Sequence, residues 1–312
     1  MKRRIIILIC AVCMILALVI TMYPLISNVA GEKYRSIVET QYDKAVEKLN
    51  TMELIAEKEE AVLYNKTLQS GTANAFSREA LAQAEQSYSR LLNVRGDGIM
   101  GYVQIPKIGV ELPIYHGTAE ETLDKGVGHL LGTSLPVGGI GTHCVLTGHS
   151  GLAGTRMFSD LDQLYNGDVF YVRVLDETHA YMIMDINTVL PEDTSKLEID
   201  PQRESVTLVT CTPFGVNTHR LLVRGERIEV GMAERVVENA EVQEEPAKST
   251  WTQEYLKGVG LGCLGIILVS ALVLTLSFAL SRNRAEDIHR PVMEAESLSC
   301  VPGRRSGRHE KR

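Results

Sequence analysis

Two long apolar runs lie near the ends of the chain, and the part between them has much shorter hydrophobic periods. Residues 5–26 are nearly all apolar and uncharged, and residues 258–280 are 23 uncharged residues rich in Leu, Val and Ile. Roughly 20 such residues cross a bilayer as a helix. The pattern therefore predicts two transmembrane helices, over residues 5–27 and 257–281.

The first apolar run follows Lys2, Arg3 and Arg4, as a secretory signal peptide also does. Two features favour an uncleaved anchor. The run is longer than the roughly 7 to 15 residues of a signal-peptide core, and only the weak stretch 27–31 offers small residues for cleavage. Cleavage stays open as the alternative.

Basic residues flank both apolar runs on their outer sides, with Arg282 and Arg284 following the second. Because cytoplasmic flanks of membrane helices are enriched in Lys and Arg, residues 1–4 and the basic tail 282–312 are expected in the cytoplasm. The part between, residues 31–256, then lies outside the cell. It carries 20 lysines and arginines against 34 aspartates and glutamates, a net charge of −14, which argues against nucleic-acid binding.

The segment 28–98 is predicted to be an extracellular helical stalk with a lid region. Apolar residues such as Ile37, Tyr42 and Val46 recur at helical spacing in a charged segment from Glu32 to about Leu68. A stalk that holds a domain away from the bilayer explains this pattern. A second helix is expected from Ser77, a suitable N-cap, to about Leu92.

From residue 99 to 232 the pattern changes to short apolar runs rich in β-branched residues and separated by Gly, Pro, Asn and Asp. Such runs predict a mainly β domain, and a closed or nearly closed barrel more than a parallel sheet. Two short helical turns are expected inside it, one from Thr118 to about Val127 with Glu121 completing a capping box, the other at 159–164. The strand candidates are 102–108, 110–115, 142–149, 168–176, 179–190, 205–211 and 220–228.

Residues 233–256 are acidic, have few apolar side chains and contain Pro246. They are therefore predicted to be a solvated linker to the second membrane helix.

Only two of the six cysteines, Cys144 and Cys211, lie in the part predicted to be extracellular; the others are Cys10, Cys13, Cys263 and Cys300. This is no disulfide framework. Either the two pair as one bridge, or at least one is kept as a thiol for chemistry. Cys144, in the middle of a strand candidate, is interpreted as a core residue, with a bridge to Cys211 as the alternative.

Three side chains at strand ends could together perform cysteine chemistry. Cys211 ends the strand "TLVTC", His149 ends "THCVLTGH", and Arg220 begins the strand after the loop 212–219. If 207–211 and 220–224 form a hairpin, Cys211 and Arg220 lie across its mouth. A thiolate, a proton carrier and a fixed guanidinium are what acyl transfer requires, although each residue alone is more often structural. No metal-ligand cluster or cofactor motif is found.

The stretch "TLVTCTPFGVNTHRLLVRGER", residues 207–227, resembles sortases, the membrane-anchored cysteine transpeptidases of Gram-positive bacteria. "GDGIMGYVQIPKIGVELPIYHGT", "THCVLTGHSG" and "FSDLDQLYNGDVFYV" are similar to the pilin-polymerising branch, class C, in content and order. The resemblance covers about residues 77–230. It implies an eight-stranded sortase-type β-barrel with N-terminal helices and two flanking transmembrane helices.

The resemblance also implies roles for particular residues. Cys211 is the nucleophile, His149 the proton carrier and Arg220 the holder of the oxyanion or substrate backbone, with Thr210 supporting these contacts. The thiolate attacks the Thr carbonyl of an LPXTG-like sorting signal, and an amine from a pilin Lys or the cell wall resolves the thioacyl enzyme. Family position alone selects His149 over its rivals His116, His129, His143 and His219.

The lid is where the sequence departs from this branch. Pilin-polymerising sortases usually cover the cleft with an Asp-Pro-aromatic motif, and here Asn74, Ala75 and Phe76 stand at the corresponding place. An amide cannot form the ion pair, and without Pro the loop loses its fixed φ. We expect a weak or frequently open lid. Alternatively, Phe76 is only an apolar staple before the helix capped by Ser77.

Two other functions remain compatible with the sequence. One is a housekeeping-type anchoring sortase or a hydrolase, which would use cell-wall amine or water as its acceptor. The other is a catalytically silent membrane-anchored binding protein, in which Cys211 is inert.

Overall fold

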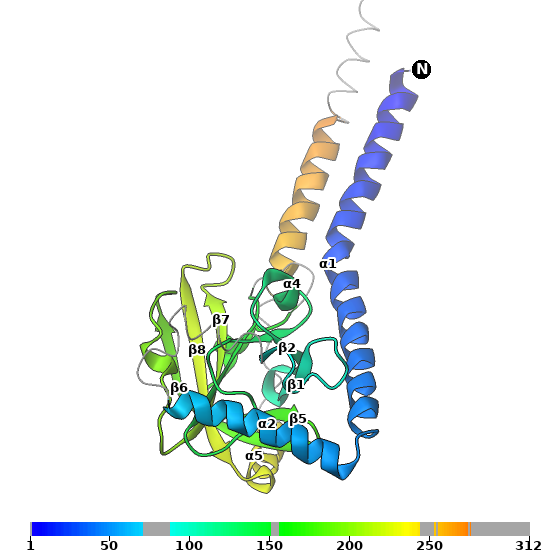
Figure 1. Cartoon of the computed structure of the whole chain (residues 1–312). Coiled ribbons are helices and arrows are strands. Elements are labelled where there is room, and N and C mark those ends of the chain that lie inside the picture. Colours follow the sequence, from blue (N-terminus) through cyan, green and yellow to red (C-terminus); the bar gives the residue numbers. More distant parts are fainter. Residues whose placement is uncertain are drawn as a thin grey trace, which may run out of the picture. The chain divides into compact units, whose positions relative to one another are not determined.

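Eight strands close into a barrel in the order β1-β2-β3-β4-β7-β8-β6-β5 (Figure 1). The computed structural model describes residues 2–70, 88–150, 156–243, 253, 255–273 and 275. Residues 22–256 form one compact unit that holds the barrel, and the two ends of the chain group separately. The strands are β1 Ile99–Ile105, β2 Val110–His116, β3 Val127–His129, β4 Thr142–Thr147, β5 Val169–Val174, β6 Glu177–Val189, β7 Glu204–Thr212 and β8 His219–Ile228.

The predicted eight-stranded barrel is thereby confirmed, and all seven strand candidates are strands. The eighth strand, β3, has only three residues and pairs in parallel with β2. It begins at Val127, the residue at which the helix predicted from Thr118 was expected to end. The actual helix, α4 Glu120–Leu123, has Ala119 as its N-cap and no side-chain cap, so the predicted capping box is wrong.

Gly126 explains why the helix stops early. A Cβ at this position would lie 2.5 Å from the Pro113 carbonyl oxygen of β2. Glycine allows this close backbone approach, and the chain then continues as β3. Three short 3₁₀ turns complete the connections: η1 Pro106–Ile108, η2 Leu161–Gln163 and η3 Ser195–Leu197.

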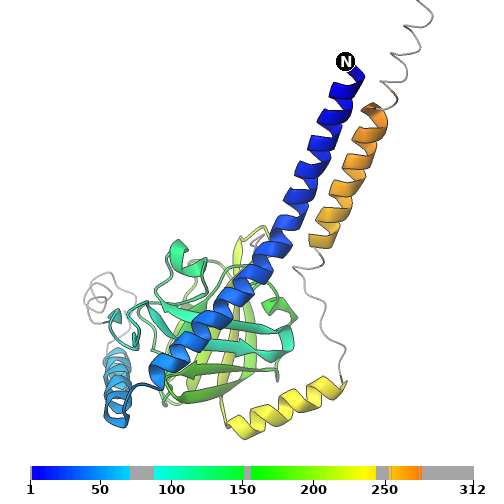
Figure 2. The ribbon, with the colours of Figure 1, turned by 90° about the vertical axis from the view of Figure 1, so that its right-hand side faces the viewer.

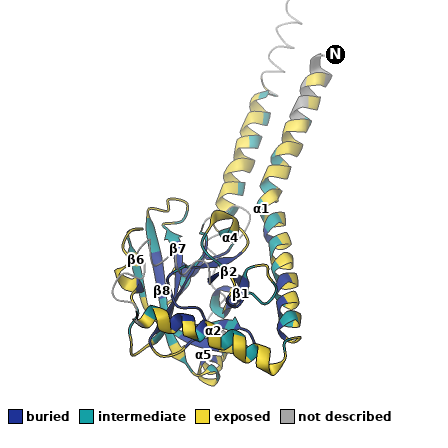
Figure 3. Ribbon diagram, viewed as in Figure 1, coloured by how far each residue is buried: buried dark blue, intermediate teal, exposed yellow. Residues whose placement is uncertain are grey.

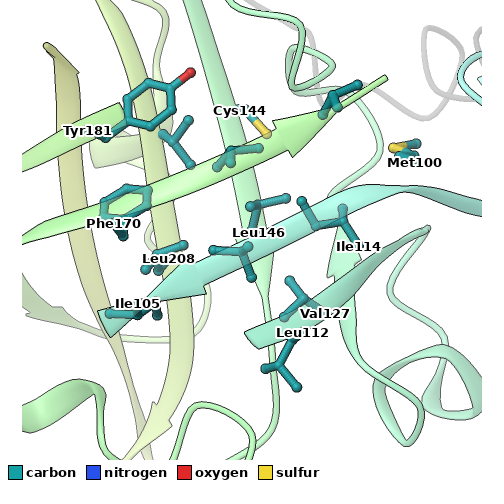
Figure 4. Close-up of a cluster of buried hydrophobic side chains, with 14 of the residues drawn as sticks. Met100, Ile105, Leu112, Ile114, Val127, Cys144, Leu146, Phe170, Tyr181 and Leu208 are labelled. Carbon is teal, nitrogen blue, oxygen red and sulfur yellow. The ribbon is translucent and has the colours of Figure 1, made fainter. Parts of the chain in front are cut away.

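The barrel interior is a continuous apolar core (Figure 4). Ile114, Leu146, Phe170 and Leu208 are fully buried and come from four different strands. Burying each such side chain contributes about 1.5–3 kcal/mol. This core fixes which face of each strand points inward, and therefore which side chains are available outside.

The N-terminal part of the chain forms two helices, α1 Lys2–Val46 and α2 Thr51–Ser70, where the sequence predicted one helix from Glu32 to Leu68. The break is a capping box that the periodicity analysis missed. The Asn50 Oδ1 accepts from the N–H groups of Met52 (3.0 Å) and Glu53 (3.1 Å), and the Glu53 carboxylate accepts from the Asn50 N–H (2.8 Å).

The second half of α1 packs along the barrel rather than standing away from it as a stalk (Figure 2). Tyr42 is fully buried, and its hydroxyl donates to the Met100 carbonyl of β1 (2.8 Å) and accepts from the Leu175 N–H after β5 (3.0 Å). One side chain of α1 thus completes hydrogen bonding between two barrel segments. The barrel and this half of α1 form one structural unit.

The α1–barrel interface also holds a carboxyl pair that predicts a pH dependence. Burial and the adjacent Glu111 raise the pKa of Glu39 to about 7. Because this folded-state pKa lies above the unfolded value, the stabilising effect is complete at low pH and is lost as pH rises through about 7. With allowance for solvent screening, the free energy of unfolding decreases by roughly 1 kcal/mol, which lowers Tm by about 2–4 °C. Glu111→Gln removes the part of the effect that comes from the neighbouring carboxylate, so its Tm, followed by circular dichroism, should fall less than the wild-type Tm between pH 5 and pH 8. Parallel Tm curves for the two proteins would contradict this assignment.

Helix α2 is fastened to the segment that leads into β4. The Asn65 side chain is almost fully buried and makes two hydrogen bonds with the backbone of Leu135, donating to its carbonyl (3.0 Å) and accepting from its N–H (2.7 Å). Lys58 forms an ion pair with Glu177. These contacts position α2 across one side of the barrel (Figure 1).

The predicted solvated linker after the barrel begins instead as a helix, α5 Val230–Gln243. Ala233 is fully buried against Val169 and Ala180 of β5 and β6, and Val236 and Val237 pack beside it. The acidic composition concealed an amphipathic helix whose few apolar residues lie on one face.

Two described helical stretches, Ala11–Val46 within α1 and Tyr255–Val273, are long and apolar enough to cross a membrane. In the most apolar part of each stretch the apolar side chains are exposed (Figure 3), as at Leu16, Ile20 and Leu261. Such all-round apolar exposure is typical of lipid-facing helices.

Candidate active site

Cys211 and Arg220 are direct partners across the β7–β8 hairpin. The pairing matches the hairpin predicted from the sequence. Both residues are half-buried. Two residue pairs further into the sheet, Val209 pairs with Leu222, and these two belong to an apolar cluster with Val145 and Leu197 on the outside of the barrel.

Strand alternation decides which face Cys211 and Arg220 share. Leu208 of β7 packs in the barrel core, so Val209 and then Cys211 point outward. Paired residues of adjacent strands point to the same side. Cys211 and Arg220 therefore lie on the outer face of the sheet, at the rim of the apolar cluster.

His149 reaches the same place from β4, which runs parallel to β7. Thr147 is the partner of Val209, and the ladder continues with the Gly148 N–H donating to the Val209 carbonyl (3.0 Å). Extending this register by two residues brings His149 beside Cys211. The structure therefore brings the three predicted residues, Cys211, His149 and Arg220, to one end of the β4-β7-β8 sheet.

The backbone around His149 is held from two sides. The Phe158 N–H donates to the His149 carbonyl (3.0 Å), and the buried Phe158 ring lies against Gly148, where a Cβ would come within 2.8 Å of the ring. Only glycine permits this contact. The "TGHSG" motif thus uses its first glycine to position the histidine that follows.

The His149 side chain is 27% exposed, and its Nε2 lies 3.9 Å from the Asp124 Oδ1. This is an ion-pair distance rather than a hydrogen bond. Asp124 follows α4 and has no sequence spacing that links it to residue 149, so the sequence analysis missed it.

Three of the rival histidines have structural roles in the described part of the chain. His116 contacts the carbonyls of Gly98 (2.9 Å) and Leu91 (2.8 Å). His129 and His143 are buried and hydrogen-bonded, and burial lowers the pKa of each to about 4. Side chains that stay neutral at physiological pH cannot serve as an imidazolium acid. His219 pairs with Thr212 and follows the opposite alternation to Arg220.

The Arg220 guanidinium is held in place by hydrogen bonds from one of its nitrogens. Its Nη1 donates to the carbonyls of His219 (3.0 Å) and Asn217 (3.3 Å). Among the described residues no hydrogen bond engages its Nε or Nη2. The guanidinium therefore keeps forked donors for an incoming carbonyl or oxyanion.

Arg220→Lys is expected to lower kcat/KM about 10²-fold, because an ammonium cannot hold the hairpin carbonyls and a substrate oxygen together. Steady-state cleavage of a sorting-signal peptide measures this. Arg224→Lys, on the same strand, is the matched control and should stay within about threefold. Equal losses in both variants would refute a specific role for Arg220.

Thr210 is 3% exposed, and its hydroxyl donates to the Gly148 carbonyl (2.8 Å). The contact ties β7 to the residue before His149. Thr210→Val keeps the shape and removes the donor, so Tm should fall by several degrees and kcat by about tenfold. Thermal denaturation and steady-state kinetics measure both. A 10³-fold loss of kcat with unchanged Tm would instead indicate direct oxyanion contact.

Cys144 is a core residue, as interpreted from its strand. It is buried inside the barrel (Figure 4), both it and Cys211 are free thiols, and burial raises the pKa of the Cys144 thiol. Its partner Val206 lies five residues before Cys211, about 16 Å along a strand. The alternative of a Cys144–Cys211 bridge is wrong.

The predicted lid residues Asn74 and Phe76 lie outside the described residues.

Comparison with known proteins identifies the family of the fold. A sortase domain family model matches residues 103–228. Sortase C1 from Streptococcus agalactiae, a solved structure, is 42% identical, with a TM-score of 0.58 over 62% of this chain and 98% of that one. The chain belongs to the sortase family.

Other sortases show how far the likeness extends. Clostridium perfringens sortase C, solved with its C-terminal cell wall sorting motif, is 38% identical with a TM-score of 0.54 over 62% of this chain and all of that one. Sortase D of Bacillus subtilis is 32% identical over 131 residues, which is 41% of this chain and 63% of the relative's length. Several of the solved neighbours are sortase C enzymes, among them a pilus-related one, and the chain fits that class of cysteine transpeptidase.

Proposed function

We propose that this sortase cleaves an LPXTG-like sorting signal between Thr and Gly and joins the Thr carbonyl carbon to an amine. The amine belongs to a pilin Lys or to the cell wall, so that the product is an assembled pilus or an anchored surface protein. The observation that carries the proposal is the direct Cys211–Arg220 pairing beside the β4 end that bears His149. A thiol, a fixed cation and a histidine at one sheet end are sufficient for acyl transfer.

In the first half-reaction, the Cys211 thiolate attacks the Thr carbonyl carbon and the carbonyl oxygen becomes an oxyanion. The guanidinium of Arg220 hydrogen-bonds this oxyanion. The His149 imidazolium then protonates the departing Gly amine as the C–N bond breaks. A thioester between the Thr residue and Cys211 remains.

In the second half-reaction, an amine attacks the thioester carbonyl and the neutral His149 accepts one proton from it. The C–S bond breaks, which regenerates the Cys211 thiolate and the imidazolium. The apolar cluster of Val145, Val209 and Leu222 next to the site offers a surface for the aliphatic residues of the sorting signal.

Product analysis tests this proposal against its two rivals. The full chain in detergent is incubated with an LPXTG-type peptide, with and without a Lys-containing pilin peptide, and the products are identified by mass spectrometry. An amide-linked product that forms faster than the hydrolysed peptide supports transpeptidation to a pilin-type acceptor. Hydrolysis alone would favour a hydrolase, and peptide binding without cleavage would favour a binding protein.

We also propose that both helices span the cell membrane, with both termini in the cytoplasm and the barrel outside. The arginines after the second apolar run and the basic residues before the first support this orientation. A membrane-impermeant maleimide should label Gly231→Cys but not Ser306→Cys in intact cells, each made in a Cys211→Ala background. Labelling of Ser306→Cys would reverse the assignment of the C-terminal tail.

A further inference from the structure

A cavity of about 220 Å³ lies between α1 and the start of β2, away from the three site residues. Glu39 of α1 and Glu111 of β2 line it, and their carboxyl groups are hydrogen-bonded to each other. Tyr102 of β1 also lines it. Tyr102 is 3% exposed, yet its hydroxyl has no hydrogen-bond partner in the described structure. Three oxygen acceptors therefore converge on one small space.

The lining of the cavity carries a net negative charge when both Glu39 and Glu111 are ionised. Its lining holds three glutamates and two arginines, a net charge of −1, and Arg156 is already paired with Asp160 at 2.9 Å. The remaining charged groups of the lining are Glu32 and Arg35. One helical turn after Glu39, Asp43 forms an ion pair with Arg173 of β5 at 2.9 Å. The charge of Arg173 is therefore shared with Asp43 and is not available to the Glu39–Glu111 pair alone. Two adjacent carboxylates are unfavourable unless they share a proton or a cation.

An ammonium group fits these acceptors better than a metal ion does. It has three N–H donors and no acceptor, which matches two carboxylates and one phenol oxygen. Ca²⁺ requires six to eight oxygen ligands, and the described residues contain no group of three or more acidic, His or Cys side chains arranged for a metal. Met157 also lines the cavity and supplies an apolar surface on which the methylene groups of a lysine side chain can pack.

The cavity is connected to the catalytic histidine through a short segment. Arg156 and Met157 line the cavity, and the next residue, Phe158, donates its N–H to the His149 carbonyl (3.0 Å). In addition, the Arg156 N–H donates to the Asn28 side chain of α1 (3.3 Å). The cavity therefore lies on the side of the barrel from which the His149 backbone is supported.

We propose that this cavity binds the ammonium group of a lysine-type amine, with Glu39, Glu111 and Tyr102 as its acceptors. It then serves as a docking site for lysines of the acceptor protein, separate from the lysine that reacts. The identity of the acceptor rests on the proposed function, whereas amine binding itself does not.

Binding is tested on the full-length Cys211→Ala protein in detergent, titrated with Nα-acetyl-lysine amide by calorimetry at pH 8. Glu39→Gln and Glu111→Gln should each weaken binding about tenfold, and Tyr102→Phe about threefold. Glu47→Gln, an exposed residue directly after the end of α1, is the control and should bind as the parent does. At pH 5.5 the carboxyl pair carries its own proton, so binding should be weaker than at pH 8.

Nα-acetyl-norleucine amide, which has the alkyl chain but no ammonium, should not bind. Equal binding of both ligands, or unchanged affinity in Glu111→Gln with an unchanged Tm, would overturn the proposal. Tight Ca²⁺ binding that excludes the amine would also overturn it, in favour of a metal site. Because Cys211→Ala performs no chemistry, a failure of the transpeptidase proposal leaves these results unaffected.

Discussion

Replacing Cys211 by alanine should abolish cleavage of an LPXTG-type peptide, with kcat falling at least about 10⁴-fold. The thiolate forms the bond that divides the reaction into two easier steps, and no other described thiol can replace it. Cys144 is buried in the barrel core, about five residues of strand away from the site. Chromatographic detection of the cleaved peptide over several hours measures the loss.

Cys144→Ala is the matched control for this variant. Removing a buried sulfur leaves a small cavity, so Tm should fall by a few degrees while kcat stays within about threefold. Equal inactivation by both substitutions would mean that thiol loss acts through folding. Retained cleavage in Cys211→Ala would mean that another residue is the nucleophile.

Replacing His149 by alanine should lower the single-turnover acylation rate by about 10²–10⁴-fold, because the departing Gly amine then lacks its proton donor. Thioacyl formation measured in a quenched-flow experiment isolates this step from amine transfer. The effect should be much smaller with activated thioester substrates, whose leaving group requires no proton. That difference distinguishes proton donation from loss of structure.

His219→Ala provides the comparison, because this residue is next to Arg220 but follows the opposite strand alternation. It should retain acylation within about threefold. If His219→Ala lowers the acylation rate as much as His149→Ala does, His219 of β8 would be the better candidate for the proton donor.

The strands of the barrel were predictable because their cause is local. Alternating β-branched runs bounded by Gly and Pro set seven strands, and the hairpin register of β7 and β8 followed from the loop length. Elements with non-local causes were missed. β3 has three residues and exists because Gly126 lets the chain approach β2, and α5 depends on Ala233 packing against β5 and β6.

The same distinction applies to the site. Cys211 and Arg220 are nine residues apart and meet across one hairpin, so the sequence could pair them. His149 meets them only because β4 runs parallel to β7. The start of β7, Glu204, lies 57 positions after the end of β4, Thr147. No local pattern encodes that contact, and His149 was chosen over other histidines by resemblance alone. Asp124 and the Glu39–Glu111 pair depend in the same way on contacts between distant elements.

The most direct test of the central claim is to locate the acyl group. Full-length protein in detergent is mixed with an LPXTG-type peptide without amine, quenched in acid, and examined by intact-mass and peptide-level mass spectrometry. The expected result is an added mass equal to the peptide up to its Thr, carried by the segment that contains Cys211 and released by hydroxylamine. An adduct on another residue, or the same adduct in Cys211→Ala, would contradict the assignment of Cys211 as the nucleophile.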